Sequence, residues 1–473
     1  MAPAVTPGTA SGYQRLSLWW EAVTVPLPPR PALTEDLDVD VCIVGAGFTG
    51  LWTAHSLALA DPSLRIAVLE REVAGFGASG RNGGWCSALF ATSDAALARR
   101  HGPEAMRAMR RAMQASVDEV GAAAAADGID CRYEKGGTIV AARSAAQVQR
   151  STNEIDEARA FGLGEEDLRW LDAGEATKVL GAKGVLGATF TPHCAAIDPA
   201  RLVRGLADTL ERRGVTVLEG TEVLAIEPAT AGQRPRVRTA LGTVVADVVV
   251  RALEGWTPTL AGAAREIAPV YSLMVATEPL PAEFWADAGL DGRPTFADHR
   301  HVIIYGQRTA DDRIAFGGRG APYHIGSSVR PSFDRDPGVF KMLRETLVEL
   351  FPALVDARIT HRWGGPVGVP RDWHSSVGYE RESGIAWAGG YVGDGVSTTN
   401  LAGRTLADLI VGRDSELVRL PWVGHRSPRW EPEPLRWLGI NMGLWATKAA
   451  DRTELRNGQP SWIAARMERL LGG

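Results

Sequence analysis

The fold of this chain is decided by a stretch near its N-terminus that reads Val41-Cys42-Ile43-Val44-Gly45-Ala46-Gly47-Phe48-Thr49-Gly50. The stretch predicts a buried strand over 38–44, a glycine-rich turn, and a helix over 49–60 that is rich in alanine and leucine. A second apolar strand is expected over 65–69, directly before Glu70. This strand–turn–helix–strand succession takes about thirty residues, the usual size of such a unit. It predicts that the chain opens with a parallel α/β fold.

The turn matches the Gly-x-Gly-x-x-Gly pattern of dinucleotide-binding folds. Gly45 permits the tight turn, Gly47 lets the backbone approach a pyrophosphate, and Gly50 lets the helix pack closely on the strand. The N-terminus of the helix offers unpaired N–H groups to the anion. Glu70 suits the two hydroxyls of a ribose, whereas it would repel a 2′-phosphate. The alternative is an ordinary turn beside a chance surface glutamate, and the matching strand, helix and carboxylate disfavour it.

A second glycine-rich loop distinguishes FAD from NAD. It reads Gly77-Ala78-Ser79-Gly80-Arg81-Asn82-Gly83-Gly84 and follows Glu70 closely, where a simple NAD enzyme more usually continues into another helix. Small residues allow this backbone to lie along a diphosphate and a flavin ring. Arg81 can offset phosphate charge, and Ser79 and Asn82 can form hydrogen bonds there. A flexible surface loop is the alternative interpretation of the same residues.

The remaining sequence alternates between two patterns. Helices are expected over 93–127, 199–213, 341–350 and 399–410, and antiparallel strands with one wetted face over 268–278 and 301–319. The parallel pattern of the opening recurs near 215–257 and closes near 385–412. We therefore predict an α/β fold, α+β overall, in which a substrate domain with an antiparallel sheet is inserted into a discontinuous nucleotide domain. The expected division is a lead-in over 1–37, an FAD-binding domain over 38–92, 196–257 and 361–412, a substrate domain over 93–195 and 258–360, and a helical tail over 413–473.

The composition restricts the class of protein. The 473 residues carry a formal charge of −5 and only four cysteines, and no apolar stretch approaches the length of a membrane helix. The charge gives no footprint for nucleic acid, and the scattered cysteines suit neither a metal site nor a redox dithiol. We expect a soluble, cytoplasmic protein without a membrane or nucleic-acid partner and without a metal.

Three motifs together resemble the D-amino-acid oxidase-like FAD oxidoreductases, a family that includes glycine oxidase, sarcosine oxidase and gamma-glutamylputrescine oxidase. They are Val41–Gly50, Leu69-Glu70-Arg71 and the loop Gly77–Gly84, whose Ala-Ser-Gly-Arg-Asn-Gly-Gly form is most similar to the gamma-glutamylputrescine oxidase branch. The resemblance extends through Pro269–Leu273, Phe316–Gly320 and Trp363–Pro366, and spans roughly residues 15–412. It implies a Rossmann-like FAD domain of the glutathione-reductase type.

The resemblance also implies which residues hold FAD. The turn and Glu70 would hold the pyrophosphate and the adenosine ribose, the second loop would run beneath the flavin, and residues near the last helix would return to its pyrimidine edge. The implied set is Gly45, Ala46, Gly47, Phe48, Thr49, Gly50, Glu70, Arg71, Ala78, Ser79, Arg81, Asn82, Gly83, Gly84, Val223, Gly364, Gly390, Gly393, Gly395, Val396, Ser397 and Thr398.

Two departures from the family pattern concern the flavin. Some relatives attach FAD through a histidine in the glycine-rich loop or a cysteine near the C-terminal flavin loop. Residues 75–90 contain no histidine and no cysteine follows Cys194, so non-covalent FAD is expected. Asp394 stands where many relatives carry a histidine or an apolar residue.

The activity implied by the resemblance is oxidation of a C–N bond in a small-molecule amine or amino acid. A hydride would pass to the flavin, water would hydrolyse the imine product, and O2 would reoxidise the flavin with release of H2O2. No obligatory acid–base residue is expected, because the flavin carries the difficult step. Tyr271 and Arg319 are the first candidates for substrate contact, followed by Tyr305 and Trp363. Arg319 could pair with a substrate carboxylate or be a strand-edge arginine in water.

Two other functions stay open at this point. A flavin monooxygenase shares the opening motif but needs NAD(P)H to reduce its flavin. A binding or assembly protein could keep FAD for structural reasons, with the Trp- and Arg-rich tail covering a partner. The tail is expected to form helices near 433–447 and 461–470 and to pack over its own substrate domain.

Overall fold

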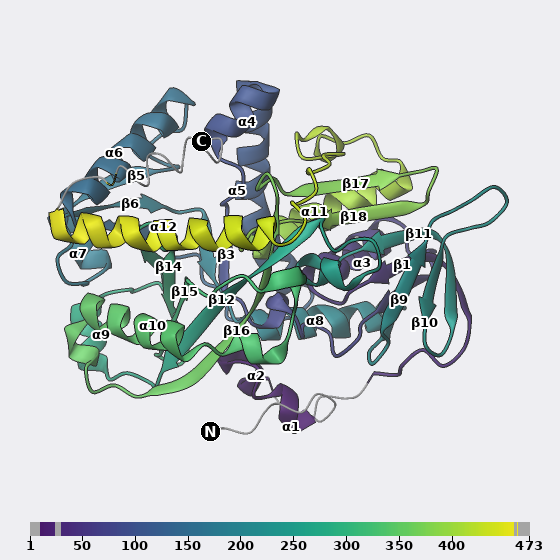
Figure 1. Ribbon diagram of the computed structural model, residues 1–473, viewed down its shortest axis with the longest axis horizontal. Coiled ribbons are helices and arrows are strands. Elements are labelled where there is room, and N and C mark those ends of the chain that lie inside the picture. Colours follow the sequence, from purple (N-terminus) through teal and green to yellow (C-terminus); the bar gives the residue numbers. More distant parts are fainter. Residues whose placement is uncertain (1–9, 24–29, 458–460, 462–473) are drawn as a thin grey trace.

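The computed structural model describes residues 10–23, 30–457 and 461, and two eight-stranded sheets organise the described chain (Figure 1). The first sheet has the order β17-β18-β11-β1-β2-β8, in which all pairings except β17–β18 are parallel. Strands β9 and β10 extend it as an antiparallel pair beside β11. The strands are β1 (Leu37–Val44), β2 (Ile66–Leu69), β8 (Thr216–Leu218), β9 (Val223–Glu227), β10 (Arg236–Thr239), β11 (Thr243–Arg251), β17 (Ser376–Glu380) and β18 (Ile385–Gly389).

Helices cover one face of this parallel sheet. Helix α3 (Phe48–Ala60) packs against α11 (Gly395–Val411) and α8 (Pro199–Arg212), and α5 (Pro103–Ala126) packs against α11. Strands that are buried on both faces read as continuous apolar runs, and Val41–Val44 of β1 are all buried. Both α3 and α11 begin at glycine-rich turns that follow parallel strands, so their N-termini meet at the same edge of the sheet.

The second sheet has the order β16-β12-β15-β14-β13-β4-β6-β5 and is antiparallel except for the pair β13–β4. Side chains alternate along β12: Leu273 and Val275 face α10, whereas Met274 and Ala276 pack toward Phe76 and the N-terminal helices. Its elements are β4 (Thr138–Ala142), β5 (Arg169–Asp172), β6 (Gly187–Thr191), β12 (Ile267–Thr277), β13 (Thr295–Asp298), β14 (Ile304–Arg308), β15 (Ile314–Arg319) and β16 (Ile359–Pro370), with helices α6 (Ala145–Ala160), α7 (Ala173–Val179), α9 (Ala282–Ala288) and α10 (Pro337–Leu350).

The elements expected from the sequence differ from the structure at a few places. The helix expected over 93–127 is two helices, α4 (Asp94–His101) and α5, because Gly102 has a φ of 87° and Pro103 starts the second helix. Helix α6 was not expected at all. Near the N-terminus, the described part of the chain has only the short helices α1 (Ala10–Tyr13) and α2 (Leu18–Glu21). Strands β3 (Trp85–Ser87) and β7 (Cys194–Ala196) form a separate, two-stranded antiparallel sheet.

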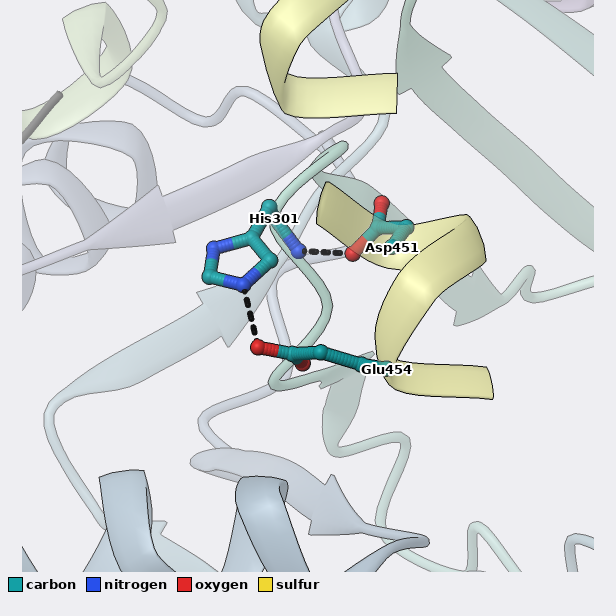
Figure 2. A group of neighbouring side chains, drawn as sticks. All are labelled: His301, Asp451 and Glu454. Carbon is teal, nitrogen blue, oxygen red and sulfur yellow. Dashed lines mark hydrogen bonds and ion pairs between the residues drawn. The ribbon is translucent and has the colours of Figure 1, made fainter. Parts of the chain in front are cut away.

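The tail crosses the second sheet as one long helix, α12 (Leu435–Asn457), drawn in yellow in Figure 1. Asp451 accepts hydrogen bonds from the backbone N–H groups of His301 and Val302, at 2.7 and 2.8 Å. Glu454 accepts from both terminal nitrogens of Arg150, at 2.9 and 2.8 Å, and lies 2.8 Å from Nε2 of His301 (Figure 2). The cluster of His301, Asp451 and Glu454 thus ties the tail to the loop before β14 of the second sheet, and Arg150 already supplies the cation that Glu454 faces. The tail packs over its own chain, as expected.

The helix expected near 461–470 lies outside the described residues. The domain boundaries stay a prediction, although the two sheets draw their strands from the alternating segments on which that prediction rests. Within the described ranges, no helix is both long enough and apolar enough to cross a membrane.

Candidate flavin and substrate site

A cavity of about 460 Å³ runs from the glycine turn after β1 to the inner face of the second sheet. Its wall includes Gly45 and Gly47, the loop around Ser79, and the start of α11 at Asp394. At its other end the wall comes from β4, β6, β14 and β15 and from helices α5 and α6. A pocket of a few hundred Å³ with a few polar groups is typical of a ligand or cofactor site.

The turn after β1 is built as its glycines predict. Gly45 has a φ of 108°, and a Cβ there would lie 2.6 Å from the carbonyl oxygen of Ala252. A Cβ on Gly50 would lie 1.9 Å from the carbonyl oxygen of Gly45, so this position needs glycine for close packing of helix on strand. The N-cap residue of α3 is Gly47, which has no side chain to cap the helix. The N-terminus of α3 therefore opens onto the cavity and can hold an anion.

Glu70 lies at the end of β2 and lines the same cavity. Its Oε2 accepts from the backbone N–H of Ala46 at 3.0 Å, and its Oε1 accepts from that of Glu72 at 3.0 Å. Burial raises the pKa of the carboxyl group, although both hydrogen bonds favour the ionised form. Beside it, the Arg71 guanidinium lies 4.4 Å from the centre of the Trp256 ring. Acceptor oxygens next to a flat cation–aromatic wall fit the ribose and base of a nucleotide.

The polar side chains of the second glycine-rich loop form hydrogen bonds that fix the conformation of the loop. Ser79 Oγ accepts from the N–H of Phe48 at 2.8 Å, which fastens the loop to the start of α3. Asn82 donates to the carbonyl oxygens of Ala78 and Ser79 and accepts from the N–H of Gly84 at 2.8 Å.

The Arg81 side chain makes its contacts within the protein. It is buried, with Nη1 2.7 Å from a carboxylate oxygen of Asp334 and 2.9 Å from the carbonyl oxygen of Gly364. Asp334 therefore offsets the Arg81 charge that the sequence suggested for a phosphate. Residues 77–79 and 81–83 of this loop border the cavity.

Most residues that the resemblance implied for FAD border the cavity. These are Gly45, Gly47, Phe48, Thr49, Glu70, Arg71, Ala78, Ser79, Arg81, Asn82, Gly83, Val223, Gly393, Gly395 and Val396. The others stand behind the wall: Ala46, Gly50, Gly84, Gly364, Gly390, Ser397 and Thr398. A cavity with a helix N-terminus at the glycine turn, a carboxylate beside it and a second helix N-terminus at its inner end fits FAD. The individual contacts to FAD stay predictions.

Glu254 is a cavity residue that the sequence reasoning missed. It follows β11, a central parallel strand, and its φ of 45° is unusual for a residue with a side chain. The carboxylate accepts from the N–H of Gly390 at 2.8 Å and from that of Tyr391 at 3.3 Å. Burial raises its pKa to about 7 in spite of these bonds. The available signal was a carboxylate just beyond a buried parallel strand, the same signal that identified Glu70.

The four substrate-contact candidates divide into two pairs. Arg319 and Tyr305 line the cavity, and the Tyr305 hydroxyl lies 2.8 Å from Oγ of Ser272. Tyr271 and Trp363 are buried away from it. Tyr271 is next to Ser272 on β12, so its side chain points to the opposite face of the sheet, among His324 and Phe333.

Trp363 lies on the face of the sheet that is turned toward the second glycine-rich loop, but the N-terminal segment covers it. Its Nε1 donates to the carbonyl oxygen of Arg81 at 2.8 Å, and its ring meets that of Trp19 edge-on at 6.2 Å. The sequence shows which residues are polar or aromatic on a strand, and the strand's register decides which of them reach the cavity.

Arg319 and Asp394 bring opposite charges to the inner end of the cavity. Arg319 on β15 is opposite Ser272 of β12, so its side chain lies on the cavity face, and Nη2 donates to the carbonyl oxygen of Val392. Asp394 immediately precedes α11. Burial raises the pKa of Asp394 to about 6, while the charge of Arg319 and a hydrogen bond from Ser87 lower it. The site therefore contains a carboxylate that is ionised at neutral pH beside a fixed cation.

Comparison with known proteins agrees with this architecture. The family model described as FAD dependent oxidoreductase (DAO) matches residues 40–409. The chain is 31% identical to the Probable oxidoreductase OrdL of Rhizobium meliloti, over 84% of this chain and 89% of that protein. It is 29% identical to gamma-glutamylputrescine oxidoreductase of Escherichia coli K12, over 88% and 95% of the two chains.

Solved structures show the same fold. Glycine oxidase from Geobacillus kaustophilus superposes with a TM-score of 0.67 at 23% identity, covering 82% of this chain and 99% of that one. L-proline dehydrogenase from P. horikoshii gives a TM-score of 0.66 at 20% identity, covering 82% and 96%. The resemblance drawn from the three motifs is confirmed. The chain is an enzyme of the DAO family of FAD-dependent oxidoreductases.

Proposed function

We propose that this enzyme oxidises a C–N bond of an amine or an amino acid. The observation that carries the proposal is the inner end of the cavity, where Tyr305, Arg319 and Asp394 meet the loop that ends at Gly83 and the start of α11. When bound, FAD supplies the acceptor for the hydride that leaves the substrate carbon. Water then hydrolyses the imine product, and O2 is the proposed final electron acceptor, with release of H2O2.

The chain's own residues position the substrate. Asp394, ionised above about pH 6, can hold the positive end of an incoming amine or take its proton, which leaves the nitrogen neutral for oxidation. Arg319 is fixed by the carbonyl oxygen of Val392 and can hold a carboxylate if the substrate has one. Tyr305 and Ser272 form a hydroxyl pair that can orient either group. Positioning the C–H bond is the protein's main contribution to such chemistry.

The relatives support this substrate class. The gamma-glutamylputrescine oxidoreductase and the glycine oxidase bear names that state an amine and an amino acid as their substrates. Non-covalent FAD is part of the proposal. Cys86, which adjoins the cavity residues Trp85 and Ser87, is fully buried. Burial raises the pKa of its thiol well above the usual value, so it is a poor nucleophile toward a flavin.

An anaerobic titration tests the proposal. The purified yellow protein is mixed with a panel of amines, N-methyl amino acids and amino acids in the absence of NAD(P)H, and bleaching of the flavin absorbance is followed. Oxygen is then admitted and peroxide is measured. Bleaching by an amine without NAD(P)H supports the proposal and excludes a monooxygenase. Bleaching that requires NADPH would overturn it, as would a flavin that no amine or amino acid reduces.

A further inference from the structure

The cavity continues well beyond its flavin end, into the space between α5, α6 and the second sheet. Its far wall includes Arg110 and Gln114 of α5, Glu154 of α6, and Asp167 and His193 from the loops between them and the sheet. An enzyme that acted only on a very small amine would have no use for this extension. Its lining therefore carries information about the part of the substrate that does not react.

Most charges at the far end already have partners. Arg110 lies 2.7 Å from a carboxylate oxygen of Asp94. Asp167 lies 2.9 Å from Nε2 of His193 and accepts from the amide of Gln114 at 2.8 Å. These pairs leave Glu154 as the carboxylate of this wall that has no ion pair with a lysine or an arginine among the described residues.

Glu154 faces the cavity. Its side chain lines the cavity and keeps 46% of its surface exposed, and partial burial raises its pKa. A hydrogen bond from Thr189 and the charge of Arg110 favour its ionised form. Nε2 of His299 lies 3.7 Å from a carboxylate oxygen of Glu154, too far for a hydrogen bond. Burial lowers the pKa of His299 to about 4, so it is neutral at physiological pH.

The wall of this extension also carries apolar side chains. Val140, Leu163, Leu168, Ala297 and Ile303 line the cavity together with the polar groups described above. Apolar walls fit the methylene groups of an alkyl chain, because burying them removes apolar surface from water. The partly desolvated carboxylate of Glu154 fits a cation at the end of such a chain.

We propose that the substrate carries a second, cationic amine at the far end of an alkyl chain, and that Glu154 binds this amine. The inference rests on the proposed amine oxidation and names the class of amine as a diamine or a longer polyamine. Glu154 is thus a specificity-determining residue, remote from the bond that is broken. Monoamines can reach the reacting end but lack the group that Glu154 recognises.

The test compares substrates matched in chain length, for example cadaverine, pentylamine and δ-aminovalerate, in flavin reduction by the holoenzyme. The wild type is expected to favour the diamine over the monoamine by about tenfold or more in kcat/KM, the factor that 1.4 kcal/mol gives. Glu154→Gln keeps the shape of the side chain and removes its charge, so this preference should fall to nearly one while the monoamine rate stays unchanged. Asp156→Asn, an exposed change on the same helix outside the cavity wall, should keep the wild-type preference.

The outcomes separate the two claims. If the monoamine reduces the flavin as well as the diamine in the wild type, or if Glu154→Gln slows both substrates equally, the inference about Glu154 is wrong while amine oxidation stands. A preference for δ-aminovalerate would overturn it in favour of an anionic far group held by Arg110. If no amine reduces the flavin, the proposed function itself fails and the inference with it. The flavin spectrum and melting temperature of each variant show that it is folded and holds FAD.

Discussion

Asp394 and Arg319 stand at the same end of the cavity, and the charge of each acts on the ionisation of the other. Burial dominates both groups: it raises the pKa of Asp394 to about 6 and lowers that of Arg319. Each opposite charge then favours the ionised form of its neighbour. A carboxylate and a guanidinium so placed form a nearly neutral pair above pH 6 and a net cation below it, and this difference can be measured.

The pH dependence of flavin reduction should report Asp394. Because its carboxyl group ionises near pH 6, the rate with an amine is expected to rise through that pH as the anion forms. Asp394→Asn should remove this step. A step near pH 7 that belongs to Glu254 should persist in the Asp394→Asn variant, because the pKa of Glu254 does not depend on the charge of Asp394. Stopped-flow reduction between pH 5 and 9 measures both, and an unchanged step near pH 6 in Asp394→Asn would contradict the assignment.

Removal of the Arg319 charge should shift the pH at which the Asp394 step in flavin reduction occurs. Arg319→Met retains an unbranched side chain but loses the cation that favours ionised Asp394. The step near pH 6 is therefore expected to shift upward by about one pH unit, since a nearby opposite charge usually changes a pKa by that much or more. Arg319→Lys is the matched control, and its step should stay close to the wild-type position. A step that does not move in Arg319→Met would show that another group sets it.

Gly50→Ala should be severely destabilising. The added Cβ would lie 1.9 Å from the carbonyl oxygen of Gly45 and 3.1 Å from Cγ2 of Ile43, so α3 has to move away from β1. We expect a loss of about 3 kcal/mol in unfolding free energy and release of FAD, as for overpacking of a rigid core. Gly439→Ala, in α12 with no atom near the added Cβ, should be neutral or stabilising. Chemical denaturation and the flavin content of the purified variants provide the two measurements.

The contacts of Glu454 that hold α12 against the rest of the chain should weaken at acid pH and on substitution of Glu454. Burial alone would raise the pKa of Glu454, but hydrogen bonds from Arg150 and His301 lower it to about 2. A lowered carboxylate pKa stabilises the fold fully above the unfolded value, about 4.3, and this contribution is lost as the pH falls toward 2. Glu454→Gln should therefore cost about 2 kcal/mol at neutral pH.

Limited proteolysis measures directly whether these contacts of Glu454 hold α12 in place. At neutral pH the variant Glu454→Gln should be cleaved in α12 faster than the wild type, and the two should become similar as the pH approaches 2. Glu431→Gln, a change to a tail carboxylate that pairs with Arg371 near the surface, is the control and should resemble the wild type. Equal cleavage of wild type and Glu454→Gln at neutral pH would show that the contacts of Glu454 do not hold the tail.

The local features of the nucleotide-binding unit were determined by the sequence. The apolar run of β1, the three glycines and Glu70 predict the strand, the turn and the acceptor because each depends on residues close together in the chain. Asp394 could likewise be singled out by its place in a glycine-rich turn before a helix. These features depend on local backbone conformations that only certain residue types adopt, and a glycine in such a pattern can be recognised directly in the sequence.

Tertiary structure alone decided which side chains meet in the cavity. Tyr271 and Ser272 are neighbours in sequence, and the pleat of β12 sends the first into the core while its register with β15 places the second opposite Arg319. Arg81 belongs to the second glycine-rich loop, but its charge is paired with Asp334, which is far away in the chain. Glu154 gains its importance only because α6 packs beside β6 and a cavity remains between them. Charge, register and burial are long-range properties, because they depend on partners that only folding brings within a few ångströms.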